Sequence, residues 1–153
     1  MLLNNKRIAF LGCGNMVQAL FPDWHKFDPT AQFFTYTPSG TKALEFAHAI
    51  GGKAVKSLFD LPPCDIYVFG FKPQTLHKVF DDFMPTNKEA IGVSLLAAVT
   101  FKELEEASGL KSLYRLMPNT PSLVGEGMMG ICSKNIPSHS TGYFDHIFNG
   151  LSQ

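Results

Sequence analysis

The stretch from Arg7 to Leu20 constrains the fold of this chain more than any other. It reads RIAFLGCGNMVQAL, in which a short apolar run, Ile8 to Leu11, meets the glycine turn Gly12-Cys13-Gly14. An amphipathic segment starts directly after it, at Asn15. The order strand, tight turn, helix opens a βαβ unit, in which the first glycine permits the turn and the second lets the backbone approach a pyrophosphate. The third glycine position of this pattern holds Val17, so the stretch also fits a strand–helix turn without a ligand.

Further apolar runs recur at intervals typical of alternating strands and helices. This alternation predicts an α/β fold of the Rossmann type, a doubly wound, mostly parallel sheet with helices on both faces. We expect a single domain over residues 1–153, since the chain is long enough for one sizeable core. The predicted strands are residues 8–11, 31–36, 53–56, 65–71, 90–98, 111–116 and 127–132, and the predicted helices are residues 15–25, 41–50, 75–84, 101–109 and 141–149.

Charge and cysteine usage exclude several classes of function. Lys plus Arg and Asp plus Glu number 13 each, so the net charge is zero, which argues against nucleic acid or an anionic membrane as the main partner. The N-terminus shows neither a secretory signal nor a membrane span, and the three cysteines have no disulfide or zinc spacing. We therefore expect a cytoplasmic protein with free thiols. The five histidines are scattered, so we predict no metal site.

Ligands of such sheets bind at the carboxyl ends of the strands, where the loop after the second predicted strand is informative. A site for NAD usually ends this strand with an acid, but residues 36–42 read YTPSGTK. Thr37, Ser39 and Lys42 offer hydroxyls and a positive charge that suit a 2′-phosphate, which favours NADP over NAD. Thr37 and Ser39 also fit plain turn and cap positions.

Two later loops are unusual in composition. Gly70-Phe71-Lys72-Pro73 places a lysine at the end of a predicted buried strand. Lys72 could lie beside the phosphate or nicotinamide of a cofactor, or it could simply be the first solvated residue after the strand. Asn119 and Thr120 lie between two prolines in a rigid polar loop that suits a small polar substrate, or in an irregular crossover. Cys13 is interpreted as a small turn residue, not a nucleophile.

Taken together, these loops resemble the Δ1-pyrroline-5-carboxylate reductase family from about residue 6 to about residue 150. The MPNTP sequence followed by VGEG is the most specific part, and the glycine turn is the least specific. The motifs that carry the resemblance are Gly12 to Met16 with Ala19-Leu20, Lys72-Pro73-Gln74, Val93-Ser94 with Ala97 to Thr100, Arg115, Met117 to Pro121 and Val124 to Gly127.

The resemblance implies transfer of a hydride from NAD(P)H to the C=N carbon of pyrroline-5-carboxylate, which gives L-proline. It implies a small-molecule substrate and a homo-oligomer, and it places Asn119 and Thr120 on the substrate side. The cofactor positions that it implies are Gly12, Cys13, Gly14, Asn15, Met16, Thr37, Ser39, Ser57, Gly70, Phe71, Lys72, Pro73, Ala97, Ala98 and Val99.

The sequence departs from the family pattern in three places. Gly70-Phe71 stands where the family has Ala-Val, and Ala98 stands at a position that is usually Gly. The helical domain that forms the family's dimer and much of its substrate pocket has no counterpart in residues 1–153. The chain is then the cofactor part of a reductase, or alternatively a non-catalytic nucleotide-fold protein that works by association. The aromatic segment from Tyr143 to Phe148 motivates this alternative, although it also fits the buried face of a helix.

Overall fold

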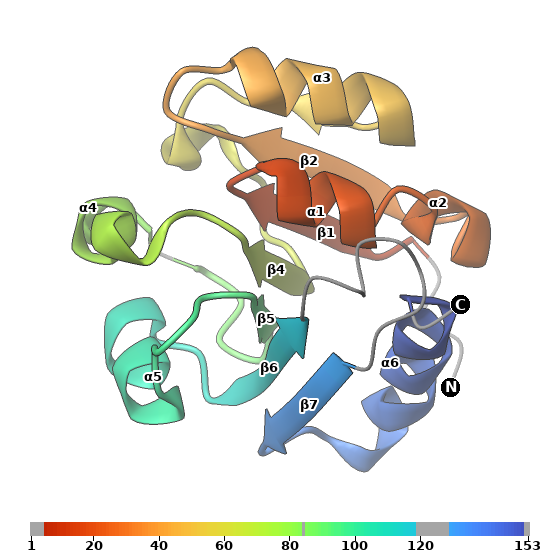
Figure 1. The fold of residues 1–153 in the computed structure, drawn as a ribbon, viewed down its shortest axis with the longest axis vertical. Coiled ribbons are helices and arrows are strands. Elements are labelled where there is room, and N and C mark those ends of the chain that lie inside the picture. The colour runs from red at the N-terminus through yellow and green to blue at the C-terminus, as the bar shows by residue number, and fades with distance from the viewer. Residues whose placement is uncertain (1–4, 84, 119–128, 152–153) are drawn as a thin grey trace.

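The computed structural model describes residues 5–83, 85–118 and 129–151 (Figure 1). These residues contain a seven-stranded sheet with the order β3-β2-β1-β4-β5-β6-β7. All neighbouring pairs are parallel except β6 and β7, which are antiparallel. The predicted fold class is confirmed. The strands are β1 (Arg7–Leu11), β2 (Gln32–Tyr36), β3 (Lys53–Ala54), β4 (Ile66–Phe69), β5 (Ile91–Ser94), β6 (Ser112–Pro118) and β7 (Met129–Lys134).

Helices cover both faces of this sheet (Figure 1). Buried side chains of α1, α2, α3 and α6 belong to one hydrophobic cluster, and those of α4 and α5 belong to the other. Short 3₁₀ turns, η1 and η2, follow β3 and β4. The helical segments are α1 (Asn15–Leu20), α2 (Trp24–Phe27), α3 (Thr41–Ile50), η1 (Leu58–Asp60), η2 (Pro73–Thr75), α4 (Leu76–Asp81), α5 (Phe101–Ser108) and α6 (Ser138–Leu151).

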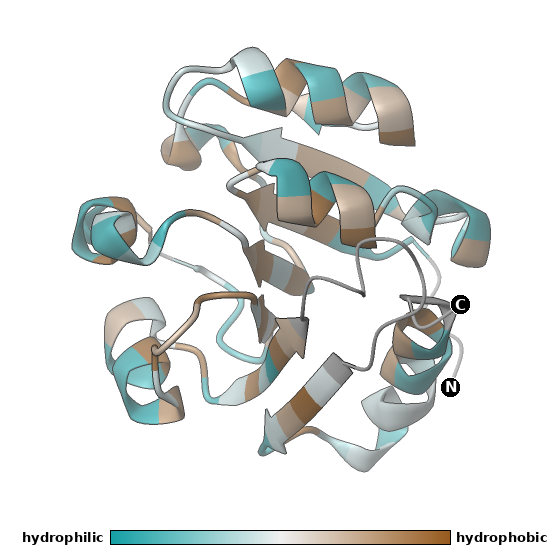
Figure 2. Ribbon diagram, viewed as in Figure 1, coloured by the Kyte–Doolittle hydropathy of each residue, from teal (hydrophilic) through white to brown (hydrophobic). Residues whose placement is uncertain are grey.

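The central strand β1 shows how the sequence builds two cores. Its successive side chains point to opposite faces, so Ile8 and Phe10 enter the first cluster while Ala9 and Leu11 enter the second. Both faces are apolar because both are covered by helices. Figure 2 shows hydrophobic residues in the central strands and a mixture of hydrophobic and hydrophilic residues along the helices.

The aromatic residues of α6 lie in the first cluster. Phe144, Ile147 and Phe148 are buried there, and the ring of Phe144 lies 4.7 Å from that of Tyr114, centroid to centroid. The buried-face interpretation of this segment is therefore confirmed, and these three side chains offer no surface to a partner.

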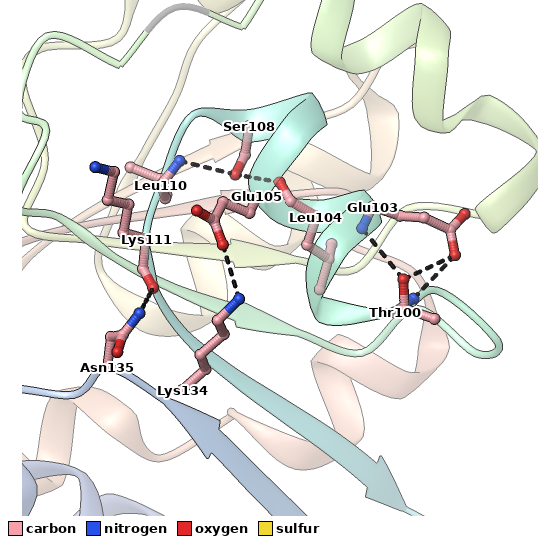
Figure 3. Close-up of polar contacts among 9 residues, drawn as sticks. All are labelled: Thr100, Glu103, Leu104, Glu105, Ser108, Leu110, Lys111, Lys134 and Asn135. Atoms are coloured by element: carbon pink, nitrogen blue, oxygen red, sulfur yellow. Dashed lines mark hydrogen bonds and ion pairs between the residues drawn. The ribbon is translucent and has the colours of Figure 1, made fainter.

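Helix α5 begins with a capping box. The Thr100 hydroxyl accepts a hydrogen bond from Glu103 N, and the Glu103 carboxylate accepts one from Thr100 N (Figure 3). The same helix is tied to β7, since Lys134 Nζ lies 2.9 Å from Glu105 Oε2. The helix ends at Gly109, as predicted, with a positive φ of 77°.

Several predicted elements are shorter than expected: the strands predicted over 53–56 and 65–71 are Lys53–Ala54 and Ile66–Phe69, and the helix predicted over 75–84 is described as Leu76–Asp81. Two further elements show the physical reason most clearly. The helix predicted over 15–25 is wrong in its length, because it breaks between α1 and α2 at Pro22, which has no N–H to continue a helix. The strand predicted over 90–98 ends at Ser94, whose hydroxyl accepts a hydrogen bond from Leu96 N and turns the chain. Both breaks arise from local chemistry that is visible in the sequence.

Candidate functional site

A cavity of about 250 Å³ lies at the carboxyl ends of β1, β2 and β4. The strand order reverses here, since β2 and β3 extend the sheet from one side of β1 and β4 to β7 from the other. Such a reversal point is where open α/β sheets bind ligands. The cavity is lined by Leu11, Gly12, Cys13, Gly14, Tyr36, Thr37, Pro38, Gly70, Phe71, Lys72, Thr75 and Val79.

Gly12 is required by the structure of the protein itself. Its φ is +91°, a conformation that L side chains rarely adopt. A Cβ at Gly12 would also lie 2.4 Å from the backbone nitrogen of Phe71. Its own N–H donates to the Tyr36 carbonyl over 2.8 Å. Gly12 thus holds the turn after β1 tightly against the turns that follow β2 and β4.

Gly14 lies in a different environment. Its φ of −73° suits any residue, and a Cβ added there would meet no heavy atom within 4 Å among the described residues. Gly14 is the N-cap of α1 and supplies no side-chain cap. The space above it lies beside the cavity and gives a ligand direct access to the backbone.

Cys13 contributes to the cavity wall without a reactive group. Its side chain is 1 % exposed and belongs to the first hydrophobic cluster. Burial raises the pKa of its thiol to about 12, because a thiolate is poorly solvated there. The thiol is protonated near neutral pH, which agrees with its interpretation as a turn residue.

Gly70 explains two departures from the expected pattern at once. A Cβ at Gly70 would lie 2.2 Å from Val17 Cγ2 and 3.1 Å from the Gly12 carbonyl oxygen. The valine at the third glycine position therefore occupies the volume that a side chain at Gly70 would need. The two turns interlock as one unit in which each accommodates the other.

Phe71 and Lys72 form the β4 side of the cavity. The Phe71 ring packs on the rings of Phe69 and Phe80, with centroids 6.3 and 5.4 Å apart. Lys72 caps η2, where its carbonyl accepts a hydrogen bond from the Thr75 hydroxyl, and its exposed side chain forms no ion pair with a described residue. This side offers an apolar wall with one cation at its mouth.

A second cavity of about 340 Å³ continues from the first, because both are lined by Thr37 and Pro38. It lies between the loop after β2, the start of α3 and the end of β3. The Thr37 hydroxyl accepts a hydrogen bond from Gly40 N and so shapes the loop. The cavity is lined by Thr37, Pro38, Ser39, Gly40, Thr41, Leu44, Ala54, Val55 and Lys56.

The predicted site residues fall into three groups. Those that line the two cavities are Gly12, Cys13, Gly14, Thr37, Ser39, Gly70, Phe71 and Lys72. Asn119 and Thr120 lie outside the described residues. Those that are described but line neither cavity are Asn15, Met16, Ser57, Pro73, Ala97, Ala98 and Val99.

Ser57 and Ala98 have structural features of their own. The Ser57 hydroxyl accepts a hydrogen bond from Phe59 N and caps η1, as the sequence predicts. Ala98 has a φ of +60°, which is strained for a residue with a Cβ and natural for glycine. The backbone after β5 thus keeps a turn that the family's usual glycine would adopt freely.

Sequence reasoning missed several lining residues, above all Lys56. This exposed lysine follows β3 by two residues and lines the second cavity. Its position at a strand's carboxyl end was the available signal, but the predicted strand extended through residue 56. Tyr36, Thr75 and Val79 were also missed, because the sequence places them at a strand end and on a helix but does not show which side chains face the cavity.

The region that contains both cavities matches a known protein family. The family model described as "NADP oxidoreductase coenzyme F420-dependent" matches residues 7–98, which include β1 to β5 and both cavities. The chain belongs to this family. The predicted resemblance to pyrroline-5-carboxylate reductases is also confirmed. The Escherichia coli enzyme of that name is 34 % identical over 131 residues, covering 82 % of this chain and 49 % of the relative.

Solved structures agree with this assignment. The pyrroline carboxylate reductase of Plasmodium falciparum, solved with NADP bound, superposes with a TM-score of 0.74 at 29 % identity over 97 % of this chain and 56 % of its own. Prephenate dehydrogenase from A. aeolicus shares only the fold, with a TM-score of 0.75 at 12 % identity over 97 % of this chain and 58 % of that one. The chain spans about half the length of the curated relatives that it matches.

The described part of the chain contains neither a membrane-spanning helix nor a cluster of metal ligands. None of its helices is long and apolar enough to cross a bilayer. Within residues 5–83, 85–118 and 129–151, no group of three or more His, Cys, Asp or Glu side chains is placed to hold a metal ion.

Proposed function

We propose that the two joined cavities bind NADPH in an extended conformation. The pyrophosphate lies over Gly12 to Met16, the adenosine half occupies the second cavity, and the nicotinamide half lies toward Gly70 to Pro73 and Ala97 to Val99. The observation that carries this proposal is the open backbone at Gly14, which lines the first cavity at the strand-order reversal. A pyrophosphate needs such direct access to backbone N–H groups.

The preference for NADPH over NADH rests on the second cavity. It contains the hydroxyls of Thr37, Ser39 and Thr41 and the ammonium of Lys56, while no acidic side chain lines it among the described residues. A carboxylate there would repel a 2′-phosphate, whereas a lysine and hydroxyls stabilise one. Lys42, which the sequence suggests for this role, does not line the cavity.

We further propose that the bound NADPH reduces L-1-pyrroline-5-carboxylate to L-proline. A hydride passes from C4 of the nicotinamide to the C=N carbon, a proton reaches the ring nitrogen, and NADP⁺ remains. The cofactor supplies the hydride, and the residues of this chain hold and orient it. We assign Asn119 and Thr120 to the substrate side of the site, as the family resemblance implies. The relatives named pyrroline-5-carboxylate reductase support this assignment.

The proposed role of residues 1–153 is that of a single NAD(P)-binding domain in such an enzyme. We propose that a helical part builds the dimer and completes the substrate pocket, as the family resemblance implies. A cytoplasmic location is supported by the thiols of Cys13, Cys64 and Cys132, none of which is paired.

Isothermal titration calorimetry with NADPH and NADH tests the cofactor proposal. NADPH binds with a micromolar dissociation constant, in the range of about 1 μM to 1 mM typical of enzyme substrates. Lys56→Met weakens NADPH binding about tenfold and leaves NADH binding unchanged, since only a charge-assisted contact is lost. The matched control Lys53→Met changes neither. Absence of binding heat with both nucleotides contradicts the proposal.

Oxidation of NADPH in the presence of pyrroline-5-carboxylate separates the reductase from the non-catalytic alternative. Turnover by this chain, alone or supplemented with a relative's helical part, supports the reductase. NADPH binding without turnover in both conditions favours a nucleotide-fold protein that acts by association. The exposed side chains of Met117 and Ile131, at the β6–β7 edge of the sheet, are the surface that such an association would cover.

A further inference from the structure

A third cavity lies at the amino ends of the strands, whereas both cavities described above lie at the carboxyl ends. It encloses about 460 Å³ and is lined by residues that precede strands: Lys6, Asp65 and Lys111 directly before β1, β4 and β6, and Lys88 three residues before β5 begins. The first turn of α6 closes it with His139. The amino ends of parallel strands thus gather several charged side chains around one hollow.

Lys6 is the most unusual of these residues. It is only 7 % exposed, yet its ammonium forms no ion pair or hydrogen bond with any side chain that the structure describes. Its Nζ lies 4.9 Å from the centroid of the Tyr143 ring. Burial lowers the pKa of Lys6, and the charges of Asp65 and Asp28 oppose this effect. The stem of Lys6 is thus largely buried, whereas its ammonium is accessible from the cavity that the residue lines.

Asp65, one of the two acids that line this cavity, already accepts a hydrogen bond from the backbone. Asp65 Oδ2 accepts a hydrogen bond from Arg7 N over 2.9 Å. At the rim, Lys88 and Lys111 are exposed, and neither forms an ion pair within the described part of the chain. Glu89 is the remaining acid of the lining, beside three lysines and His139. The lining therefore carries three lysines against two acids, with the ammonium of Lys6 open to the cavity and without an ion pair among the described residues.

We propose that this cavity binds a small organic anion through phosphate or carboxylate groups, with Lys6 as the buried contact and Lys88 and Lys111 as rim contacts. Its volume falls within the range of about 300 to 1,000 Å³ usual for small-molecule sites. The site is separated from the Gly12–Gly14 turn by the length of β1, about 15 Å for five residues. Nucleotide and anion can therefore bind at the same time.

Titration of the ¹⁵N-labelled 153-residue chain with citrate, and separately with inorganic phosphate, tests this proposal by NMR. Sodium chloride holds the ionic strength constant, so that screening does not vary. We expect saturable shifts at the amides of Asp65, Lys88, Lys111 and His139. Tighter binding of citrate assigns the site to polycarboxylates, and tighter binding of phosphate assigns it to phosphorylated molecules.

Variants establish the role of the lysines. Lys6→Met keeps the apolar stem on Tyr143 and weakens binding about tenfold or more, as expected for loss of a charge-assisted contact. Lys111→Met, at an exposed position, weakens binding to a smaller extent and gives a readout if Lys6→Met fails to fold. Lys102→Met, on the surface of α5, is the matched control and leaves binding unchanged.

Three outcomes overturn the proposal. One is the absence of saturable shifts at this cavity with both anions. Another is shifts confined to Gly12–Val17, which assign anion binding to the nucleotide site alone. The third is equal affinity for the anion in the unmodified chain, Lys6→Met and Lys111→Met, which would show that neither lysine contacts the anion.

Discussion

Gly12 and Gly14 stand two residues apart in one turn, and the structure requires them for different reasons. Gly12 has a positive φ and no room for a Cβ, because the backbone of Phe71 lies against it. Gly14 has an ordinary φ and open space in front of it within the described structure. The first glycine satisfies the packing of the protein, and the second leaves room that no described residue fills.

This difference separates stability from binding within a single motif. A glycine that the fold needs is explained by its neighbours, whereas a glycine that faces empty space at a cavity is explained by what the cavity receives. Substitutions at the two positions should therefore affect different measurements. The interlocked turns after β1 and β4 allow this separation to be tested step by step.

Gly12→Ala is expected to have the largest effect on stability. The new Cβ is strained by the positive φ and meets backbone atoms that cannot rotate away. Together, backbone strain and overpacking cost about 3 kcal/mol or more. Urea denaturation followed by circular dichroism measures the change. A loss below about 1 kcal/mol would show that the turn rearranges freely.

Gly70→Ala is expected to cost about 1–3 kcal/mol through its clash with Val17. The obstacle here is a side chain, so Val17→Ala in the same chain should recover part of the loss. A double-mutant cycle of unfolding free energies measures this coupling. Strictly additive effects would contradict the interlocking of the two turns.

Gly14→Ala should reverse the pattern of Gly12→Ala. Its free energy of unfolding is expected to stay within about 0.5 kcal/mol of the unmodified chain, as for surface substitutions. NADPH affinity, measured by calorimetry, should fall about tenfold because the methyl group blocks backbone contact with the pyrophosphate. Unchanged affinity would remove the distinction between the two glycines.

Cys13, between the two glycines, makes the free energy of unfolding depend on pH in the alkaline range. Burial raises the pKa of the thiol in the folded protein to about 12 from its ordinary value of 9.0. The stabilisation is complete below pH 9 and is lost as the pH rises toward 12, because the unfolded chain loses its proton first. In Cys13→Ala the loss of stability between pH 8 and pH 10 should be smaller by about 1 kcal/mol. Denaturation at both pH values, with Cys132→Ala as the exposed control, measures this difference.

Glu105→Gln should have the smallest effect and sets the scale for the others. It breaks the partly exposed ion pair with Lys134 (Figure 3), which is worth about 0.2–1 kcal/mol. Thermal and urea unfolding at low and high salt measure it, and the difference from the unmodified chain should shrink at high salt. A larger loss would mean that α5 and β7 depend on this pair for their packing.

Local patterns predicted much of the fold. The helix predicted over 41–50 is confirmed as α3, with Gly51 as its αL cap, and the helix predicted over 101–109 is confirmed as α5, with Thr100 and Glu103 as its capping box. The apolar run before Lys72 predicted a buried strand, and all four residues of β4 are buried. Pro22 was also a readable signal, although the helix was predicted to continue through it.

The candidate site was less predictable because its key contacts join distant segments. The sequence places Val17 at a glycine position but does not show that Gly70, 53 positions later, leaves the space for it. The role of Lys56 depends on where β3 ends and how the loop after β2 folds beside it. Such contacts depend on tertiary packing, which neither periodicity nor turn chemistry specifies.

The most direct test of the account is an NMR titration of the ¹⁵N-labelled chain with NADPH. The account predicts saturable shifts, with one common dissociation constant, at Gly14 on β1's turn, at Thr37 between the cavities and at Lys56 in the second cavity. Shifts absent from these three amides, or saturating with different constants, would contradict a single dinucleotide bound across both cavities.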